Sequence, residues 1–274
     1  MRHVFAAAAA LAAAVVLSFL VLPLVALFVH VPPGELLRAL GSDAARDALV
    51  VSAKTSAIAH AAVLVVGTPA AYALARSRFR GRSFVLTLVE LPLVLPPAVA
   101  GIALLVTFGR LGLLGGALDA LGVRVSFTQA AVVLAVAFVE LPFYLRGAVA
   151  SFESVDPTLL DAARTLGARP WRVFARVAVP IAAGGLAAAS ALALARGLGE
   201  FGATILFAGS LQGVTQTLPL AIYAQFDVDL DTALAIGALF VVFGAVVLTV
   251  VKLLPGWTRF VSASAFRSAG SVST

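Results

Sequence analysis

Six long apolar runs are the feature that most limits how this chain can fold. They cover residues 4–29, 48–75, 84–108, 129–150, 177–208 and 232–254. About 20 consecutive apolar residues in a helix cross the ~30 Å hydrocarbon core of a bilayer. Only 12% of the 274 residues are charged and 62% are hydrophobic, whereas soluble domains carry about 25% charged residues. We therefore predict an all-α integral membrane protein with six transmembrane helices.

The first run could be mistaken for a secretory signal. The apolar part of a signal peptide is about 7–15 residues long, and residues 4–29 exceed that length. We therefore expect a retained first helix. The predicted organisation has three parts: residues 1–47 form this helix and an external amphipathic segment, residues 48–254 form the core of five helices, and residues 255–274 form a disordered cytoplasmic tail.

The charges predict the orientation in the membrane. The net charge is +6, and Arg and Lys gather in residues 76–82, in residues 164–176 and near both ends of the chain. The acidic residues gather on the opposite side of the predicted spans. Because cytoplasmic loops are enriched in Lys and Arg, both termini are expected in the cytoplasm of a bacterial cell, with the chain in its inner (plasma) membrane. Basic charge that is spread over short loops of one face argues against nucleic-acid binding.

The segment 156–180 predicts a structured loop between the fourth and fifth spans. Asp156 is a favourable helix N-cap, Pro157 suits the first helical position, and Gly167 suits the left-handed residue that closes a helix. Pro170 would open a second helix. The expected element is an amphipathic helix of about ten residues outside the membrane. It would serve either as a docking element for a partner or as a helix lying in the lipid interface.

This loop resembles the EAA loop of the permease subunits of ABC importers. Asp161-Ala162-Ala163, Gly167 and Val179-Pro180 match its spacing, with Asp in place of the usual Glu. The resemblance implies the fold of a type I ABC importer and a coupling helix that docks on a separate ATPase subunit, two copies per complex. The residues implied in coupling are Asp161, Ala162, Ala163, Arg164 and Gly167.

The chain lacks the sequence of a nucleotide-binding loop. A phosphate-binding loop needs Gly-Lys-Ser/Thr, and neither Lys54 nor Lys252 follows a glycine. ATP and Mg²⁺ are therefore expected on the partner, with no cofactor, no metal and no enzyme activity on this chain. An intramembrane enzyme is only a remote alternative. The sequence lacks the catalytic patterns such an enzyme would need, since it has no HExxH, no GxSxG and no cysteine. An ungated channel would not need the capped loop.

Residues 196–210 and 213–223 narrow the resemblance to molybdate-type permeases, which are related to sulfate permeases. This resemblance implies import of molybdate or tungstate by a homodimer, with the ion delivered by a periplasmic or lipid-anchored binding protein. Sulfate or thiosulfate import is the alternative, since these ions have the same charge and shape as molybdate.

Charged residues inside the spans are costly and are candidates for function. Arg196 and Glu200 lie four residues apart, so they either border the translocation pathway or form a pair that holds the helix packing. Thr204, Pro96 and Pro97 are further pathway candidates. With Pro92, these prolines predict a break in the third span, which is either a simple kink or a broken helix beside a cavity.

Four other polar residues also lie inside the predicted spans. Lys54 is expected to extend toward the interface, and His60 to be a hydrogen-bonded packing residue. Glu90 and Glu140 are expected to pair with Arg146 or with the arginines of residues 76–82, or to be protonated. Small residues at 182–190 suit either a homodimer interface or packing within the chain.

Overall fold

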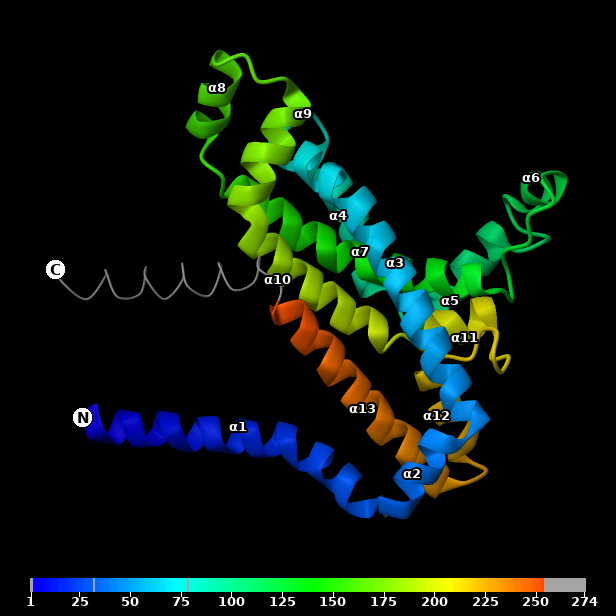
Figure 1. The fold of residues 1–274 in the computed structure, drawn as a ribbon. Helices are drawn as coiled ribbons and strands as arrows, with labels where there is room; N and C mark the ends of the chain where they lie inside the picture. Colours follow the sequence, from blue (N-terminus) through cyan, green and yellow to red (C-terminus); the bar gives the residue numbers. More distant parts are fainter. Residues whose placement is uncertain (1, 32, 78, 254–274) are drawn as a thin grey trace.

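A computed structural model describes residues 2–31, 33–77 and 79–253, and within them every regular element is a helix (Figure 1). The predicted tail 255–274 lies outside the described residues. The helices are α1 Arg2–His30, α2 Pro33–Gly41, α3 Asp43–Arg76, α4 Arg82–Val94, α5 Pro97–Phe108, α6 Gly115–Ala120, α7 Gln129–Glu153, α8 Pro157–Thr165, α9 Pro170–Val173, α10 Val179–Leu198, α11 Gly202–Ala208, α12 Leu218–Phe226 and α13 Leu230–Leu253, with a π-helical turn at Phe174–Ala178 between α9 and α10.

The predicted all-α membrane fold is confirmed. Among the described residues, five helical segments are long and apolar enough to span a bilayer: α1, α3, α7, the continuous segment Pro170–Leu198, and α13. The sixth candidate is the pair α4 and α5, which is bent by 113°. Arg82, the first residue of α4, pairs with Glu153 at the end of α7. The other half of the pair, α5, packs beside the first half of α7. The bent pair therefore connects the two ends of the bundle as one broken span.

The predicted fifth span is wrong at its far end. It was expected to cover residues 177–208, but α10 ends at Leu198 and a separate short helix, α11, follows. The Glu200 side chain interrupts the run, because its Oε1 accepts a hydrogen bond of 2.7 Å from the backbone N–H of Ala203. A carboxylate that satisfies an unpaired N–H of this kind starts a new helix. Apolar composition alone does not reveal this break.

The centre of the bundle is formed by α3, α7 and α10. The two helices α3 and α7 run in the same direction, since Lys54 contacts Gln129 near their starts and Arg76 contacts Phe152 near their ends. A Cβ placed on Gly147 of α7 would lie 2.6 Å from the Cβ of Ala189 on α10. Small residues therefore bring α7 and α10 together, as the internal-packing alternative expected.

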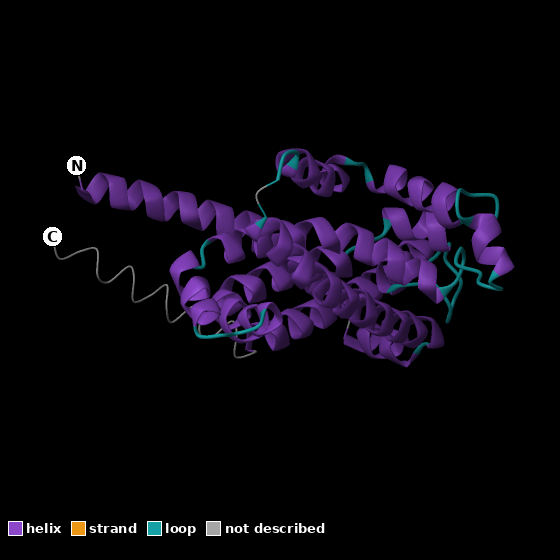
Figure 2. Cartoon of the chain, turned by 90° about the horizontal axis from the view of Figure 1, so that it is seen from above, coloured by secondary structure: helices purple, strands orange, loops and turns teal. Residues whose placement is uncertain are grey.

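The first helix stands apart from this bundle in Figures 1 and 2. The apolar window of Phe5–His30 is 0% buried. Only the last part of α1 approaches the body, where Leu27 lies beside Gly237 of α13. The end of α1 thus meets the first half of α13, so the start of α1 and the end of α13 lie toward the same side of the bundle.

Candidate coupling loop and cavity

The short helix predicted in residues 156–180 is present as α8, at one end of the bundle (Figure 1). Asp156 caps its start, with Oδ1 accepting a 2.9 Å hydrogen bond from the backbone N–H of Thr158. This backbone hydrogen bond, and a second one from the side chain of Thr158, lower the pKa of Asp156 below its ordinary value. Pro157 occupies the first helical position, as expected. The second predicted helix also begins where expected, at Pro170.

Gly167 closes α8 in the left-handed conformation, with φ 82°. The backbone N–H of Ala168 then donates to the carbonyl of Ala163 at 3.0 Å, which satisfies a carbonyl at the helix end. A side chain at position 167 would strain the backbone by about 1–2 kcal/mol. Both predicted caps are therefore observed.

The two faces of α8 differ. Leu160 is buried in the central hydrophobic core, so it fixes the helix to the bundle. Asp161 and Arg164 form an exposed ion pair of 2.8 Å. Exposed apolar side chains lie beside them, with Leu166 88% and Trp171 64% exposed. An exposed surface with both apolar side chains and a charged pair suits docking of another protein.

Arg76 anchors the loop that leads into α8. Its Nη2 donates hydrogen bonds of 2.8 and 2.7 Å to the carbonyls of Phe152 and Val155. The neighbouring Arg82 pairs with Glu153 and also donates to the carbonyl of Leu74. The sequence predicts only that these arginines contribute to the positive charge of the cytoplasmic side. The sequence does not distinguish Arg76 and Arg82 from Arg80 in the same loop, because the partners of Arg76 and Arg82 lie far along the chain.

The candidate pathway residues Arg196 and Glu200 form an ion pair of 3.1 Å. The Glu200 side chain is only 1% exposed and also caps α11. This geometry favours the structural alternative for the pair. Thr204, on α11, is fully buried, and its Oγ1 has no hydrogen-bond partner among the described residues.

The other two candidates, Pro96 and Pro97, lie at the sharp bend between α4 and α5. Pro97 packs against α11, because a Cβ atom added to Gly202 would lie 2.6 Å from the Cβ atom of Pro97. The structure thus brings Pro97 close to α11, which carries Thr204. The residues of α8 that the sequence predicted to act in coupling lie at the other end of the bundle (Figure 1).

A buried polar network joins α3, α7 and α10. Nδ1 of His60 lies 2.9 Å from Oε2 of Glu140, and its Nε2 lies 2.9 Å from Oγ of Ser190. The expectation that His60 is a hydrogen-bonded packing residue is met. The expectation that Glu140 pairs with an arginine is wrong, because its partner is His60 from another helix.

Lys54 and Glu90 also have observed partners. Lys54 Nζ donates to Oε1 of Gln129 at 2.8 Å, so its ammonium is held by a neighbouring helix. Glu90 lies 3.7 Å from Arg146, which is one of the pairings expected from the sequence.

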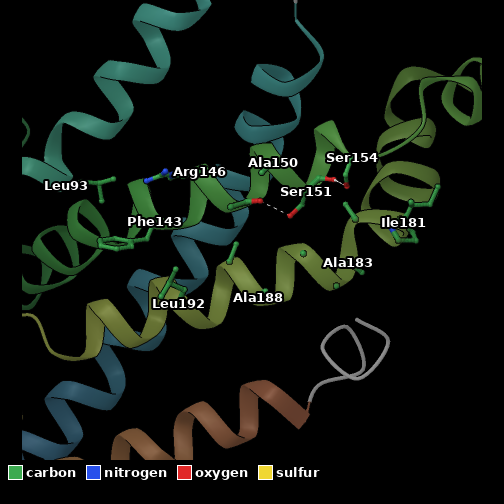
Figure 3. Close-up of a pocket in the computed structure, with 16 residues that line it drawn as sticks. Leu93, Phe143, Arg146, Ala150, Ser151, Ser154, Ile181, Ala183, Ala188 and Leu192 are labelled. Atoms are coloured by element: carbon green, nitrogen blue, oxygen red, sulfur yellow. Dashed lines mark hydrogen bonds between the residues drawn. The ribbon is translucent and has the colours of Figure 1, made fainter. Parts of the chain in front are cut away.

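A cavity of about 940 Å³ lies between α7 and α10, with Leu93 of α4 at its border (Figure 3). Small residues such as Ala183 and Ala188 form the α10 wall, and Arg146 and Ser151 belong to the α7 wall. The small residues of α10 therefore serve two purposes, close packing on α7 and the opening of this space.

Comparisons with known proteins agree with this architecture. The chain is 45% identical over 229 residues to the molybdenum transport system permease protein ModB of Mycobacterium tuberculosis, covering 84% of this chain and 87% of that protein. It is 33% identical over 245 residues to the sulfate transport system permease protein CysW of Synechocystis, covering 88% of each.

Among solved structures, a chain of a bacterial ABC transporter involved in alginate import matches with a TM-score of 0.71 and 18% identity, covering 89% of this chain and 92% of that one. At this identity the match concerns the fold alone, which is that of the membrane subunit of an ABC importer. Residues 64–260 match the family described as binding-protein-dependent transport system inner membrane component. This protein belongs to that family of membrane transport components.

Proposed function

We propose that the chain is the membrane-spanning permease subunit of an ATP-driven importer of molybdate or tungstate. The observation that carries this proposal is α8, a capped helix outside the spans whose inner face is fixed to the core and whose outer face is exposed. The 45% identity to a molybdenum permease over most of both chains supports the choice of ion. The lower identity to a sulfate permease makes sulfate the second candidate.

In this proposal α8 docks on a separate ATPase subunit. Two permease chains and two ATPase subunits form the complex, and a periplasmic or lipid-anchored binding protein delivers the ion. ATP-driven closure of the ATPase subunits pulls on α8. The hydrogen bonds from Arg76 to the carbonyls of Phe152 and Val155 pass this movement to α3 and α7. The bundle then alternates between states open to either side.

The orientation in this proposal places both termini and α8 in the cytoplasm. The cluster of arginines in residues 76–82, at the same end of the bundle as α8, supports this choice. The alternative in which α8 lies in the lipid interface predicts no contact with an ATPase.

The first test reverses the charge of an exposed residue on α8. Asp161→Lys removes the pair with Arg164 but changes no buried contact, so the bundle is expected to remain folded. ATP hydrolysis by the reconstituted complex should lose its stimulation by loaded binding protein. Asp119→Lys, on α6, is the matched control and should leave stimulation unchanged. Full stimulation in Asp161→Lys would contradict docking through α8.

The second test identifies the ion. Stimulation of ATP hydrolysis and uptake into proteoliposomes are measured with molybdate, tungstate and sulfate in parallel, each with its own loaded binding protein. Uptake of molybdate and tungstate but not sulfate is expected. Uptake of sulfate alone would favour the second candidate, and ion flow without any ATPase would favour a channel.

A further inference from the structure

The cavity between α7 and α10 contains one charged side chain. Of the residues that line its 940 Å³, only Arg146 carries a charge, and the α10 wall is made of small and apolar residues. Arg146 lies about 10 Å before the end of α7, at 1.5 Å per residue. A charged residue at such a position in a spanning helix faces a partner or a water-filled space, and it often marks an ion pathway.

The guanidinium of Arg146 is open to this space. Its side chain is 71% exposed, and it makes no hydrogen bond to any residue in the described part of the chain. The carboxylate of Glu90 is its one ion-pair partner there, at 3.7 Å, which is longer than a hydrogen bond. Glu90 itself is 47% exposed. The planar fork of donors that binds oxyanions best is therefore unused.

Three other arginines near the spans are already engaged. Arg76 donates to two backbone carbonyls, and Arg82 pairs with Glu153. Arg196, a candidate from the sequence, is bound to the buried Glu200. Among these groups, Arg146 is the one that combines free donors with a cavity.

We infer that Arg146 is the contact point for the transported oxyanion in this cavity, and that Glu90 keeps that contact weak. This inference rests on the proposed import of a tetrahedral dianion. The anion displaces Glu90 from Arg146, accepts hydrogen bonds from the guanidinium and then leaves as Glu90 returns. A conduit needs binding that is favourable enough for entry and weak enough for release, and a loosely held carboxylate competitor provides that balance.

The test compares two neutral variants in the complete complex of permease, ATPase and binding protein. Arg146→Gln should lower the rate of molybdate uptake by about tenfold, the factor expected for one lost charge-assisted hydrogen bond. Glu90→Gln should raise the affinity of the nucleotide-free complex for molybdate, without binding protein, by a similar factor. Stimulation of ATP hydrolysis should persist in both, because neither residue contacts α8.

Arg124→Gln is the matched control, since it removes an exposed arginine from the loop before α7 and should change neither measurement. Arg146→Lys keeps the positive charge but lacks the planar guanidinium. Its rate of molybdate uptake should lie between those of the wild type and Arg146→Gln. An intermediate rate would also show that the loss in Arg146→Gln is not caused by misfolding.

Three outcomes would overturn the inference. Equal losses of uptake in Glu90→Gln and Arg146→Gln would indicate a structural ion pair. Unchanged molybdate binding in both variants would exclude anion contact. A loss in Arg146→Gln that depends on anionic lipid in the vesicles, with molybdate binding unchanged, would assign Arg146 to a lipid phosphate. Failure of the proposed function itself would appear in the wild-type complex, as absence of oxyanion uptake.

Discussion

At the scale of single residues, ionisable side chains inside the bundle are matched to partners on other turns or helices. Glu140 meets His60, and Glu200 meets both Arg196 and the backbone N–H of Ala203. An unpaired charge in a medium without water is costly, so each partner removes a penalty. The spacing of Arg196 and Glu200 predicted their pairing, because both lie within one turn of helix.

Glu200→Ala should lower the free energy of unfolding by about 3 kcal/mol, because it leaves a charge unpaired and removes the cap of α11. Thermal unfolding of the detergent-solubilised protein measures this loss. Arg196→Ala should lower the free energy of unfolding by less, because the Arg196 side chain is 34% exposed. Glu200→Gln should keep the hydrogen bond that caps α11. Normal thermal stability with abolished uptake in Glu200→Ala would instead support a pathway role.

At the scale of elements, α8 is a capped helix attached to one end of the bundle. Its caps are local, and the sequence predicted both of them correctly from Asp156, Pro157 and Gly167. Its attachment is not local, since Arg76 reaches the carbonyls that precede α8 from the end of another helix. The caps give α8 its form, whereas the attachment gives it mechanical contact with the spans.

Arg76→Gln should weaken the coupling of ATP hydrolysis to uptake, because α8 then moves without carrying α3 along. Loss of two hydrogen bonds from a charged donor should also cost about 1.5–3 kcal/mol of stability. The ratio of ATP hydrolysed to molybdate imported is the measurement. Arg80→Gln, an exposed change in the same loop, is the control. An unaltered ratio in Arg76→Gln would show that the anchor does not transmit movement.

At the scale of the whole molecule, close contact between α7 and α10 forms one wall of the cavity between these helices. Gly147 and Ala189 meet where the two helices are closest and also line the cavity, whose α10 wall continues over Ala183 and Ala188. A run of small residues in the sequence indicates close packing but not which side of the helix is packed. Only the position of α7 decides this.

Gly147→Ala should destabilise the bundle by about 1–3 kcal/mol through overpacking against Ala189. The double variant Gly147→Ala with Ala189→Gly should recover most of that loss, and thermal unfolding of the purified protein measures both. Gly244→Ala, on an open part of α13 where a Cβ meets nothing within 4 Å, should be neutral or slightly stabilising. Failure of the double variant to recover stability would show that the helices meet elsewhere.

The sequence by itself determined that the chain enters a membrane, roughly where its spans lie and where α8 begins and ends. These properties depend on apolar run length and on caps, which act within one turn of helix. The tertiary structure alone decided that the fifth span stops at Leu198, that His60 joins Glu140 and Ser190, and that Arg146 faces a cavity. The His60 contacts join residues 80 and 130 positions apart, and no local pattern encodes which helix faces which.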